Sequence, residues 1–334
     1  GHQFGGPHTF SGTGGNCAGN GSAANAVEPA SGSTIMAYAG ICGPDVQPNS
    51  DAYFHAVSIA SMNAHMVGTG NCAPQTNNGN TVPVIAALTN YTIPKGTAYV
   101  LTGSATDADA GAALTYCWEQ TNAASGTDIP TTTQTTGPVY RSLSPTTSPS
   151  RYMPNFASVL SGNLTPAYEV TPSIGRTLNF ALTVRDNQTP TGGQTARANM
   201  TVTTVNAAGP FAVTAPTSGD SWNTSTSQNI TWNVAGTTAN GINTANVNIL
   251  LSTDGGQTWN ITDAAQTDLA DGSYQFKAVV TDIAGNHSET ATQQVTVDRK
   301  LELLNNIVKI KSVTDDNTIS LSEKDQTIPI RIQI

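Results

Sequence analysis

Two histidines near the start of the chain are spaced so that they could hold a metal ion. His2 and His8 flank Gly5 in the order H-x-x-G-x-x-H. In zinc sites of this order the first imidazole lies on a helical turn, and the glycine lets the backbone turn sharply because it adopts positive φ at little cost. The second imidazole then binds the same ion, and one coordination position stays open for water. The spacing therefore predicts hydrolytic zinc chemistry.

A second stretch supports this interpretation. Residues 33–40 read Ser-Thr-Ile-Met-Ala-Tyr-Ala-Gly, the form of the methionine turn below the zinc in metzincin peptidases. With the histidine spacing, this turn makes residues 1–75 resemble the reprolysin-like zinc metallopeptidases secreted by Bacteroidetes-type bacteria. The resemblance implies that His2 and His8 bind zinc, that Met36 lies below the metal, and that Tyr38 lies near the site. The alternative is that Met36 is a buried methionine beside an ordinary turn.

The sequence departs from this family at the general base. The full signature is H-E-x-x-H-x-x-G-x-x-H, so its first histidine and its glutamate would precede residue 1. That glutamate takes a proton from zinc-bound water, and two histidines hold zinc more weakly than three. We therefore expect the chain as written to lack a catalytic residue, to hold Zn²⁺ weakly or not at all, and to be inactive. The full-length parent would cleave protein substrates.

Composition excludes several classes of protein. Only 10% of the 334 residues are charged, the formal net charge is -9, and no basic cluster is present. We exclude a nucleic-acid partner because nothing would neutralise the phosphates. The abundance of Thr, Asn, Ser and Gly is typical of extracellular β-sandwich arrays. No apolar run approaches the ~18 residues that span a bilayer, so we expect a secreted or cell-surface protein without a transmembrane segment.

The cysteine count agrees with an oxidising compartment. An even number of cysteines in a secreted-type chain suggests two disulfides, with three connectivities open. The cysteines are Cys17, Cys42, Cys72 and Cys117. We favour a Cys17–Cys42 bond, which would clamp the loop between the zinc histidines and the methionine turn.

The elements around the candidate site follow from local patterns. Residues 9–32 are rich in Gly, Ser and Asn and predict a loop. Helical spacing of apolar residues predicts one helix over residues 50–66, capped by Ser50 or Asn49. His55 and His65 lie on this helix, and we interpret them as packing or surface residues rather than zinc ligands.

The rest of the chain predicts a mainly β fold, with tandem Ig-like sandwich modules after a small α-containing remnant of a metzincin catalytic domain. Alternating strands around a central tryptophan indicate an Ig-like module, resembling the polycystic-kidney-disease type, over residues 82–207. Residues 121–176 form a long insertion that we expect to serve binding or to be poorly ordered. Asp107 and Asp109 are candidate Ca²⁺ ligands, with a solvated turn as the alternative.

A second Ig-like module is expected over residues 208–299. It contains the pattern S-x-D-x-G-x-x-W at residues 252–259, in which Asp254 should bond backbone amides and Trp259 should pack under the turn. From about residue 260 the sequence resembles the Ig-like repeats of large bacterial adhesins, a change that the sequence does not explain. Residues 300–334 resemble the start of another repeat or a donor-strand tail, with Asp315 and Asp316 as candidate Ca²⁺ ligands.

These observations leave three functions open. The chain could be the C-terminal part of an active zinc-dependent endopeptidase. It could instead be a structural or adhesive protein, including a filament subunit that self-associates through its terminal strands, and we favour this function for the chain as written. A carbohydrate-binding array is the weakest alternative, because aromatic residues make up only 6% of the chain.

Overall fold

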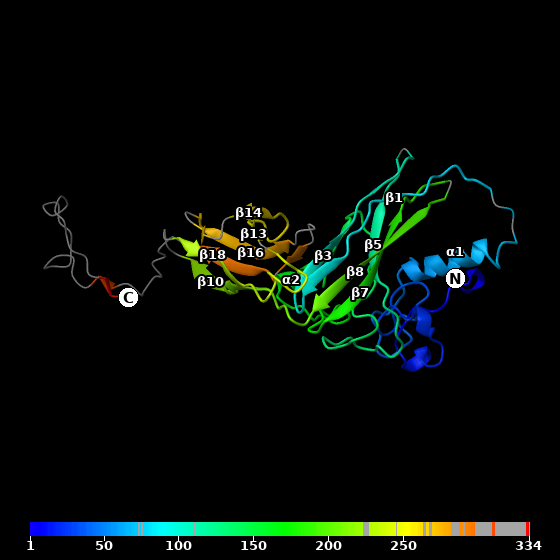
Figure 1. Ribbon diagram of the computed structural model, residues 1–334, viewed down its shortest axis with the longest axis horizontal. Coiled ribbons are helices and arrows are strands. Elements are labelled where there is room, and N and C mark those ends of the chain that lie inside the picture. Colours follow the sequence, from blue (N-terminus) through cyan, green and yellow to red (C-terminus); the bar gives the residue numbers. More distant parts are fainter. Residues whose placement is uncertain are drawn as a thin grey trace.

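The protein is an elongated array, with a loop-rich N-terminal segment (residues 1–72) followed by two β-sandwich modules (Figure 1). The computed structural model describes residues 1–297 and the strand residues 309–310 and 332–333. Within 1–297, the positions outside the description are 73, 75, 110, 191, 223–226, 245, 263–264, 267–268, 282–286 and 290. The expected mainly β fold is confirmed, with its helices concentrated near the N-terminus.

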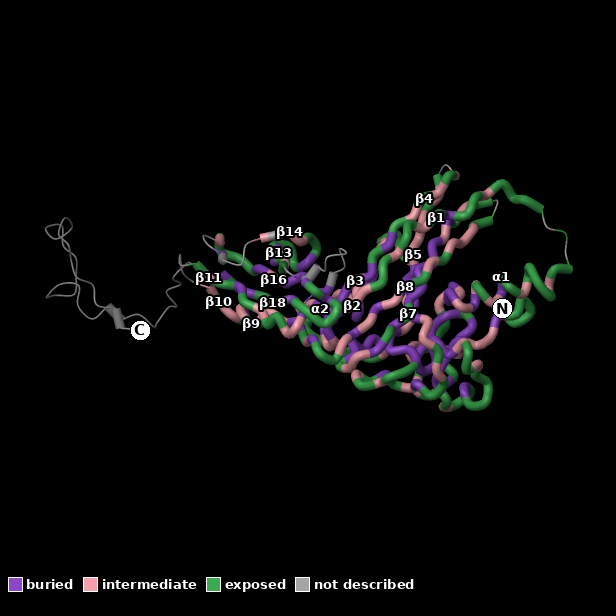
Figure 2. Tube along the Cα trace, in the orientation of Figure 1, coloured by how far each residue is buried: buried purple, intermediate pink, exposed green. Residues whose placement is uncertain are grey.

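The N-terminal segment contains three short 3-10 helices and one α-helix, which are η1(His2–Phe4), η2(Gly15–Cys17), η3(Ala23–Asn25) and α1(Ala56–Val67). Long stretches of this segment are loop, as the Gly-rich composition of residues 9–32 predicts, and yet many loop residues are buried (Figure 2). The favoured Cys17–Cys42 disulfide is present, with the two Cα atoms 5.4 Å apart. It joins η2 to the chain that follows the 33–40 turn.

The expectation of two disulfides is wrong. Cys72 is an exposed free thiol that follows α1, whereas Cys117 is a buried free thiol in the first module. The Cys117 thiol donates to the carbonyl of Leu143, 3.3 Å away. Burial raises the pKa of this thiol well above its ordinary value, so Cys117 behaves as a packing residue.

Helix α1 begins six residues later than the sequence pattern indicates. Residues 51–55 are held in extended contact with the 33–40 turn, where the amide of Asp51 donates to Ser33 and the amide of Ile35 donates to Tyr53. The helix then starts at Ala56, and the ring of His55 accepts from the amide of Val57 as its cap. Ser50 and Asn49 are therefore not the caps. Tertiary pairing with the turn prevails over local helical periodicity.

The first module (residues 82–207) is a sandwich of two sheets. One sheet has the order β2-β8-β7-β5, in which the β2–β8 pair is parallel and the other pairs are antiparallel. Strands β3 and β6 pair antiparallel opposite it, and β1 pairs β4. The bounds are β1(Val84–Ile85), β2(Tyr91–Pro94), β3(Ala98–Thr102), β4(Ala105–Thr106), β5(Thr115–Gln120), β6(Ser150–Met153), α2(Phe156–Leu160), β7(Arg176–Arg185) and β8(Thr195–Val205).

The core of this module lies between its two sheets, where the buried colour in Figure 2 follows β7 and β8. Leu178, Phe180 and Leu182 alternate along β7 and are fully buried, as the period-two pattern predicts. Trp118, the central tryptophan of the pattern, is 3% exposed. Its indole N–H donates to the carbonyl of Pro149, 2.9 Å away, so the one polar atom of the ring is satisfied.

The long insertion (residues 121–176) is an integral part of the first module. It supplies β6 and α2, and it contributes Val139, Tyr140, Met153 and Val170 to the core cluster. The expectation that it is poorly ordered is therefore wrong. The insertion also forms backbone hydrogen bonds with the N-terminal segment, described below. That it serves binding to another molecule stays a prediction.

The second module (residues 208–299) is joined to the first by a shared sheet. Strand β17 pairs antiparallel with β3, placing Ser288 opposite Tyr99, and the path continues as β10-β18-β16-β17-β3-β6. Its strands are β9(Ala212–Ala215), β10(Asp220–Trp222), β11(Gln228–Asn229), β12(Thr231–Asn233), β13(Val247–Ser252), β14(Asn260–Thr262), β15(Ala265–Gln266), β16(Gly272–Thr281), β17(His287–Glu289) and β18(Gln293–Val297). Two further strands, β19(Lys309–Ile310) and β20(Ile332–Gln333), follow this module in the chain and pair with each other.

A buried lysine reinforces this joint between the modules. Lys277 on β16 is 5% exposed and pairs with Glu289 on β17 at 2.5 Å. Its ammonium lies 4.4 Å from the ring centre of Trp259 and 5.5 Å from that of Tyr152, which belongs to β6 of the first module. One cation thus contacts both modules. Separating the modules would remove the contact of Lys277 with the Tyr152 ring and break the pairing of β17 with β3, so we expect the two modules to move as one body.

The predicted turn at residues 252–259 is confirmed. Asp254 accepts from the backbone amides of Gln257 and Thr258 and from the Thr258 hydroxyl, at 3.0, 2.9 and 2.6 Å. The indole of Trp259 donates to the carbonyl of Gly256 at 3.0 Å. These hydrogen bonds favour the charged carboxylate, the Thr258 hydroxyl most of all, and they lower the pKa of Asp254 to about 2.

Removing the Thr258 hydroxyl should raise that pKa. In a Thr258→Val variant we expect the carboxyl titration of Asp254 to move from about 2 toward the ordinary ~3.9. Because the folded-state pKa is depressed, the turn's contribution to stability is present above pH ~4 and is lost as the pH falls toward 2. Carboxyl-detected NMR titration measures the midpoint. Asp220, whose pKa is lowered by Thr217, is the internal control and should not move; an unchanged Asp254 midpoint contradicts the assignment.

Candidate metal centre

The two N-terminal histidines lie side by side. His2 begins η1, and the helix ends at Gly5, which adopts a left-handed conformation with φ 76°. The amide of Gly5 donates to the carbonyl of His2, 2.9 Å away. The chain turns back after Gly5, and the ring centroids of His2 and His8 are 4.6 Å apart. The turn that the spacing predicts at Gly5 is confirmed.

Each histidine ring is held by a backbone carbonyl through its Nδ1 atom. Nδ1 of His2 is 2.8 Å from the carbonyl of Gly6, and Nδ1 of His8 is 3.1 Å from the carbonyl of Met36. Because a carbonyl can only accept, Nδ1 carries the proton in both contacts and each Nε2 keeps its lone pair. Histidines that bind metals commonly have their second nitrogen held in this way. The pair thus fits two of the ligands of a zinc site.

The 33–40 turn lies directly against this pair. Met36 is 4% exposed, and its carbonyl accepts from both the His8 ring and the amide of Thr9. A Cβ on Gly1 would lie only 1.9 Å from the Met36 sulfur, so the methionine packs closely against the residue that precedes His2. The ring of Tyr38 lies 4.3 Å from that of His8, at a steep angle. The structure therefore brings together the four residues that the sequence singled out.

Partial burial adjusts the electrostatics of His8. Burial lowers the pKa of His8 below its ordinary value of 6.5 and prevails over the Met36 hydrogen bond, which acts in the opposite direction; nearby His2 lowers it further. A lowered pKa favours the neutral imidazole, which is the form that binds metals. No third ligand joins the pair within the described part of the chain, which holds no group of three His, Cys, Asp or Glu residues suited to a metal.

His55 and His65 are packing residues, as expected. His55 is 1% exposed, and its Nε2 atom lies 3.7 Å from the carboxylate of Glu119. The Cβ position of Gly5 would lie 2.7 Å from the Cβ atom of His65, so α1 packs against the turn between the two candidate ligands.

The candidate calcium ligands are engaged locally. Asp107 accepts from the amide of Asp109 at 2.8 Å, and Asp109 accepts from the amide of Thr81 at 2.6 Å. These contacts hold the turn at the start of the first module, and Ca²⁺ binding there stays a prediction. Asp315 and Asp316 lie outside the described residues.

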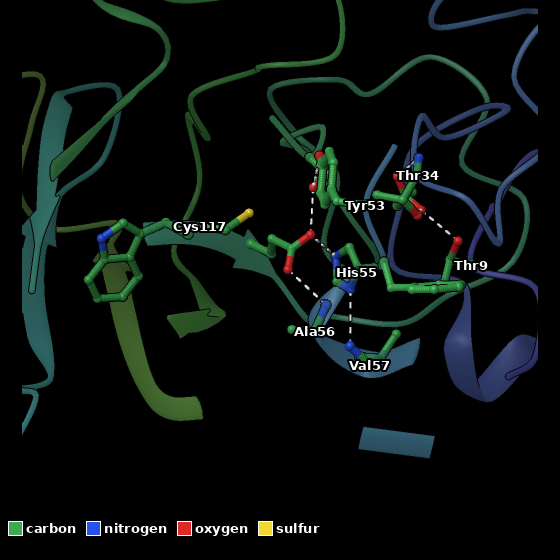
Figure 3. Close-up of polar contacts among 12 residues, drawn as sticks. Thr9, Thr34, Tyr53, His55, Ala56, Val57 and Cys117 are labelled. Atoms are coloured by element: carbon green, nitrogen blue, oxygen red, sulfur yellow. Dashed lines mark hydrogen bonds and ion pairs between the residues drawn. The ribbon is translucent and has the colours of Figure 1, made fainter. Parts of the chain in front are cut away.

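Two buried carboxylates near the site were not singled out from the sequence. Glu28 is 1% exposed and Glu119 is fully buried. Figure 3 shows their surroundings, with Thr9 and Thr34 around the first and Tyr53, His55 and Ala56 around the second. One signal was available for Glu28, since it is the only acidic residue in the 9–32 loop. Glu119 lies in the largely buried strand β5, and no pattern in the surrounding sequence indicates its role.

The N-terminal segment is bound to the first module by backbone pairing. The amide of Ala30 donates to Thr127 at 2.8 Å, and the amide of Gly126 donates to Ser11 at 2.7 Å. The hydroxyl of Ser11 also donates to the carbonyl of Thr127 at 2.8 Å. The insertion therefore supports the loop that follows His8 through these hydrogen bonds.

Comparison with known families agrees with this arrangement. Residues 1–65 match the family described as Metallo-peptidase family M12B Reprolysin-like, and residues 224–299 match the family described as Bacterial Ig-like domain. The second match runs through residue 260 without a break, so the change in sequence character there falls inside one module. No curated protein matches the chain. The N-terminal segment is thus reprolysin-like, and the chain continues into Ig-like modules.

Three solved structures are similar to parts of the chain. Fibronectin(III)-like modules of Clostridium thermocellum CbhA are 20% identical, covering 28% of this chain and 100% of theirs, with a TM-score of 0.22. Mouse Cadherin-23 EC22-24 is 18% identical, covering 65% of this chain and 66% of its own, with a TM-score of 0.23. The tandem Ig repeats of Dlar are 13% identical, covering 65% and 97%, with a TM-score of 0.33. Across the described residues, no helix is both long and apolar enough to span a membrane.

Proposed function

We propose that the N-terminal segment supplies two zinc ligands, His2 and His8, of a reprolysin-like endopeptidase centre, and that the Ig-like modules carry and position it. The observation behind this proposal is the pair of imidazoles whose Nδ1 atoms are both held by backbone carbonyls. That arrangement leaves two Nε2 lone pairs on neighbouring rings. Met36 acts as the methionine of the metzincin turn, because its carbonyl fixes one of these ligands.

When bound, zinc polarises a peptide carbonyl and lowers the pKa of a bound water. The chain's own part is to orient the two imidazoles, and the partial burial of His8 lowers its pKa and so favours the neutral form of that ring. Hydrolysis requires a third ligand and a general base in addition to this pair. The disulfide and the Ig-like modules support an extracellular location, where disulfides persist.

Zinc binding by the purified chain tests the proposal. We expect isothermal titration calorimetry to show one Zn²⁺ per chain, and His2→Ala or His8→Ala to weaken binding by more than ~10-fold. His287→Ala is the control, since His287 lies on β17 of the second module and is not a proposed ligand. Binding that survives loss of both His2 and His8 contradicts the proposal.

An extension can sharpen this test. Adding His-Glu-Ala before Gly1 completes the order H-E-x-x-H with His2. If the pair is part of a three-histidine centre, this extension should tighten zinc binding by at least ~10-fold, whereas an Ala-Ala-Ala extension should leave it unchanged.

A second candidate function is structural or adhesive, and one observation favours it. The sheet that runs from β18 to β6 and the buried Lys277 join the two modules into one elongated unit (Figure 1). Self-association through the terminal strands involves residues 300–334, of which the structure describes only β19 and β20, paired with each other. Light scattering distinguishes the two functions: large assemblies without bound zinc favour the structural one.

A further inference from the structure

Glu28 is buried and its carboxylate accepts four hydrogen bonds. The hydroxyls of Thr9 and Thr34 donate to its Oε2 at 2.5 and 2.6 Å. The amides of Ser33 and Thr34 donate to its Oε1 at 2.9 and 3.2 Å. Thr9, Ser33 and Thr34 are themselves fully buried, so these contacts are shielded from solvent.

These donors come from two parts of the chain whose relative position the candidate metal centre depends on. Thr9 directly follows His8, whereas Ser33 and Thr34 begin the turn that contains Met36 (Figure 3). The carbonyl of Thr9 accepts from the amide of Glu28 at 2.9 Å, and the amide of Thr9 donates to the carbonyl of Met36 at 3.2 Å. Glu28 therefore forms hydrogen bonds both with the residue that follows His8 and with the start of the 33–40 turn.

We propose that Glu28 is a positioning residue for His8. By joining Thr9 to the 33–40 turn, it keeps the Met36 carbonyl in place to hold the His8 ring with its Nε2 lone pair available. The inference rests on the proposed function in one respect only, namely that His8 binds zinc. Glu28 itself does not touch the ligand atoms and is not a catalytic residue.

The four donors match a carboxylate at this position. A carboxylate has two oxygens that both accept, which matches two amides and two hydroxyls. A glutamine would turn one accepting oxygen into an NH₂ group that only donates. That group cannot face the two amides, which only donate. If it faces the two hydroxyls, they must become acceptors, and the short charge-assisted bonds from Thr9 and Thr34 are lost. Glu28→Gln therefore conserves the size and burial of the side chain and changes only the hydrogen bonds that join Thr9 to the 33–40 turn.

The decisive experiment compares Glu28→Gln with the unaltered chain by two readouts. Zinc affinity is measured by calorimetry, where we expect a loss of about 10-fold, the lower end of the range for an outer partner of a metal ligand, because Glu28 acts on His8 through Thr9 and the Met36 carbonyl. The His8 tautomer is measured by ¹⁵N NMR without metal. In the unaltered chain we expect one tautomer with the proton on Nδ1, and in Glu28→Gln a mixture of both.

Glu169→Gln is the matched control. Glu169 is 3% exposed and also accepts from several donors, among them Arg151 and Asn155, but it lies in the first module. It should lower stability without changing zinc affinity or the His8 tautomer. If Glu28→Gln changes both readouts no more than Glu169→Gln does, the inference is overturned.

Two milder variants at Thr9 test the same inference if Glu28→Gln does not fold. Thr9→Val removes the hydroxyl that donates to Glu28 at nearly constant volume, and Thr9→Ser retains it. We expect Val to mix the His8 tautomers and Ser to preserve the single one; equal spectra for both overturn the inference. If the unaltered chain binds no zinc and yet its fixed tautomer is lost in these variants, the proposed function fails while the positioning role stands.

Discussion

Replacing Glu119 by alanine should detach the start of α1 from the first module. The Glu119 carboxylate accepts from the amide of Ala56 at 2.7 Å and from the hydroxyl of Ser142 at 2.6 Å, and the Ser142 hydroxyl accepts from that of Tyr53 at 2.6 Å. His55 adds a contact at 3.7 Å. Alanine would leave buried donors without an acceptor, and we expect a loss of about 3 kcal/mol.

Hydrogen exchange followed by mass spectrometry locates that loss. Peptides from residues 51–67 should lose protection in Glu119→Ala, and peptides from the second module should not. Glu119→Gln is the control, because its amide oxygen can still accept from Ala56, and its effect should be smaller. If exchange at residues 51–67 is unaffected by the alanine variant, Glu119 does not couple the N-terminal segment to the module.

Replacing Gly5 by alanine should separate the two candidate zinc ligands. Gly5 has φ 76°, and a Cβ there would lie 2.7 Å from the Cβ atom of His65 and 2.9 Å from its Cγ atom. The left-handed conformation alone costs an alanine about 1 kcal/mol. The collision with α1 adds to that cost, so we expect a total of about 2–3 kcal/mol and a clear loss of zinc affinity.

Gly19 provides a matched control for this variant. Its φ is 74°, close to that of Gly5, but no atom lies within 4 Å of its Cβ position. Gly19→Ala should therefore cost only the backbone term of about 1 kcal/mol and leave zinc binding unchanged. Thermal unfolding and zinc calorimetry on both variants measure the difference. Equal effects would show that contact with His65 plays no part in holding the histidine pair.

The sequence by itself determined the features that depend on short-range geometry. The spacing of His2, Gly5 and His8 predicted a turn that brings the two rings together, because only glycine takes the required backbone conformation cheaply. The same holds for the turn at Asp254, whose hydrogen bonds join residues no more than four positions apart. Period-two alternation likewise predicted the core-facing residues Leu178, Phe180 and Leu182 of β7, since strand geometry fixes which side chains share a face, whereas the burial of Ala181 and Thr183 on the other face depends on the tertiary structure.

Only the tertiary structure decided the features that depend on partners distant in the chain. The start of α1 is set by residues 51–55 pairing with the 33–40 turn and by Glu119, which lies 63 positions from Ala56. The burial of the 121–176 insertion is set by its packing into the core of the first module, and hydrogen bonds join it to the N-terminal segment. The roles of Glu28 and Glu119 come from donors that meet them only after folding. Local propensity cannot report such contacts, because each isolated segment would satisfy the same polar groups with water.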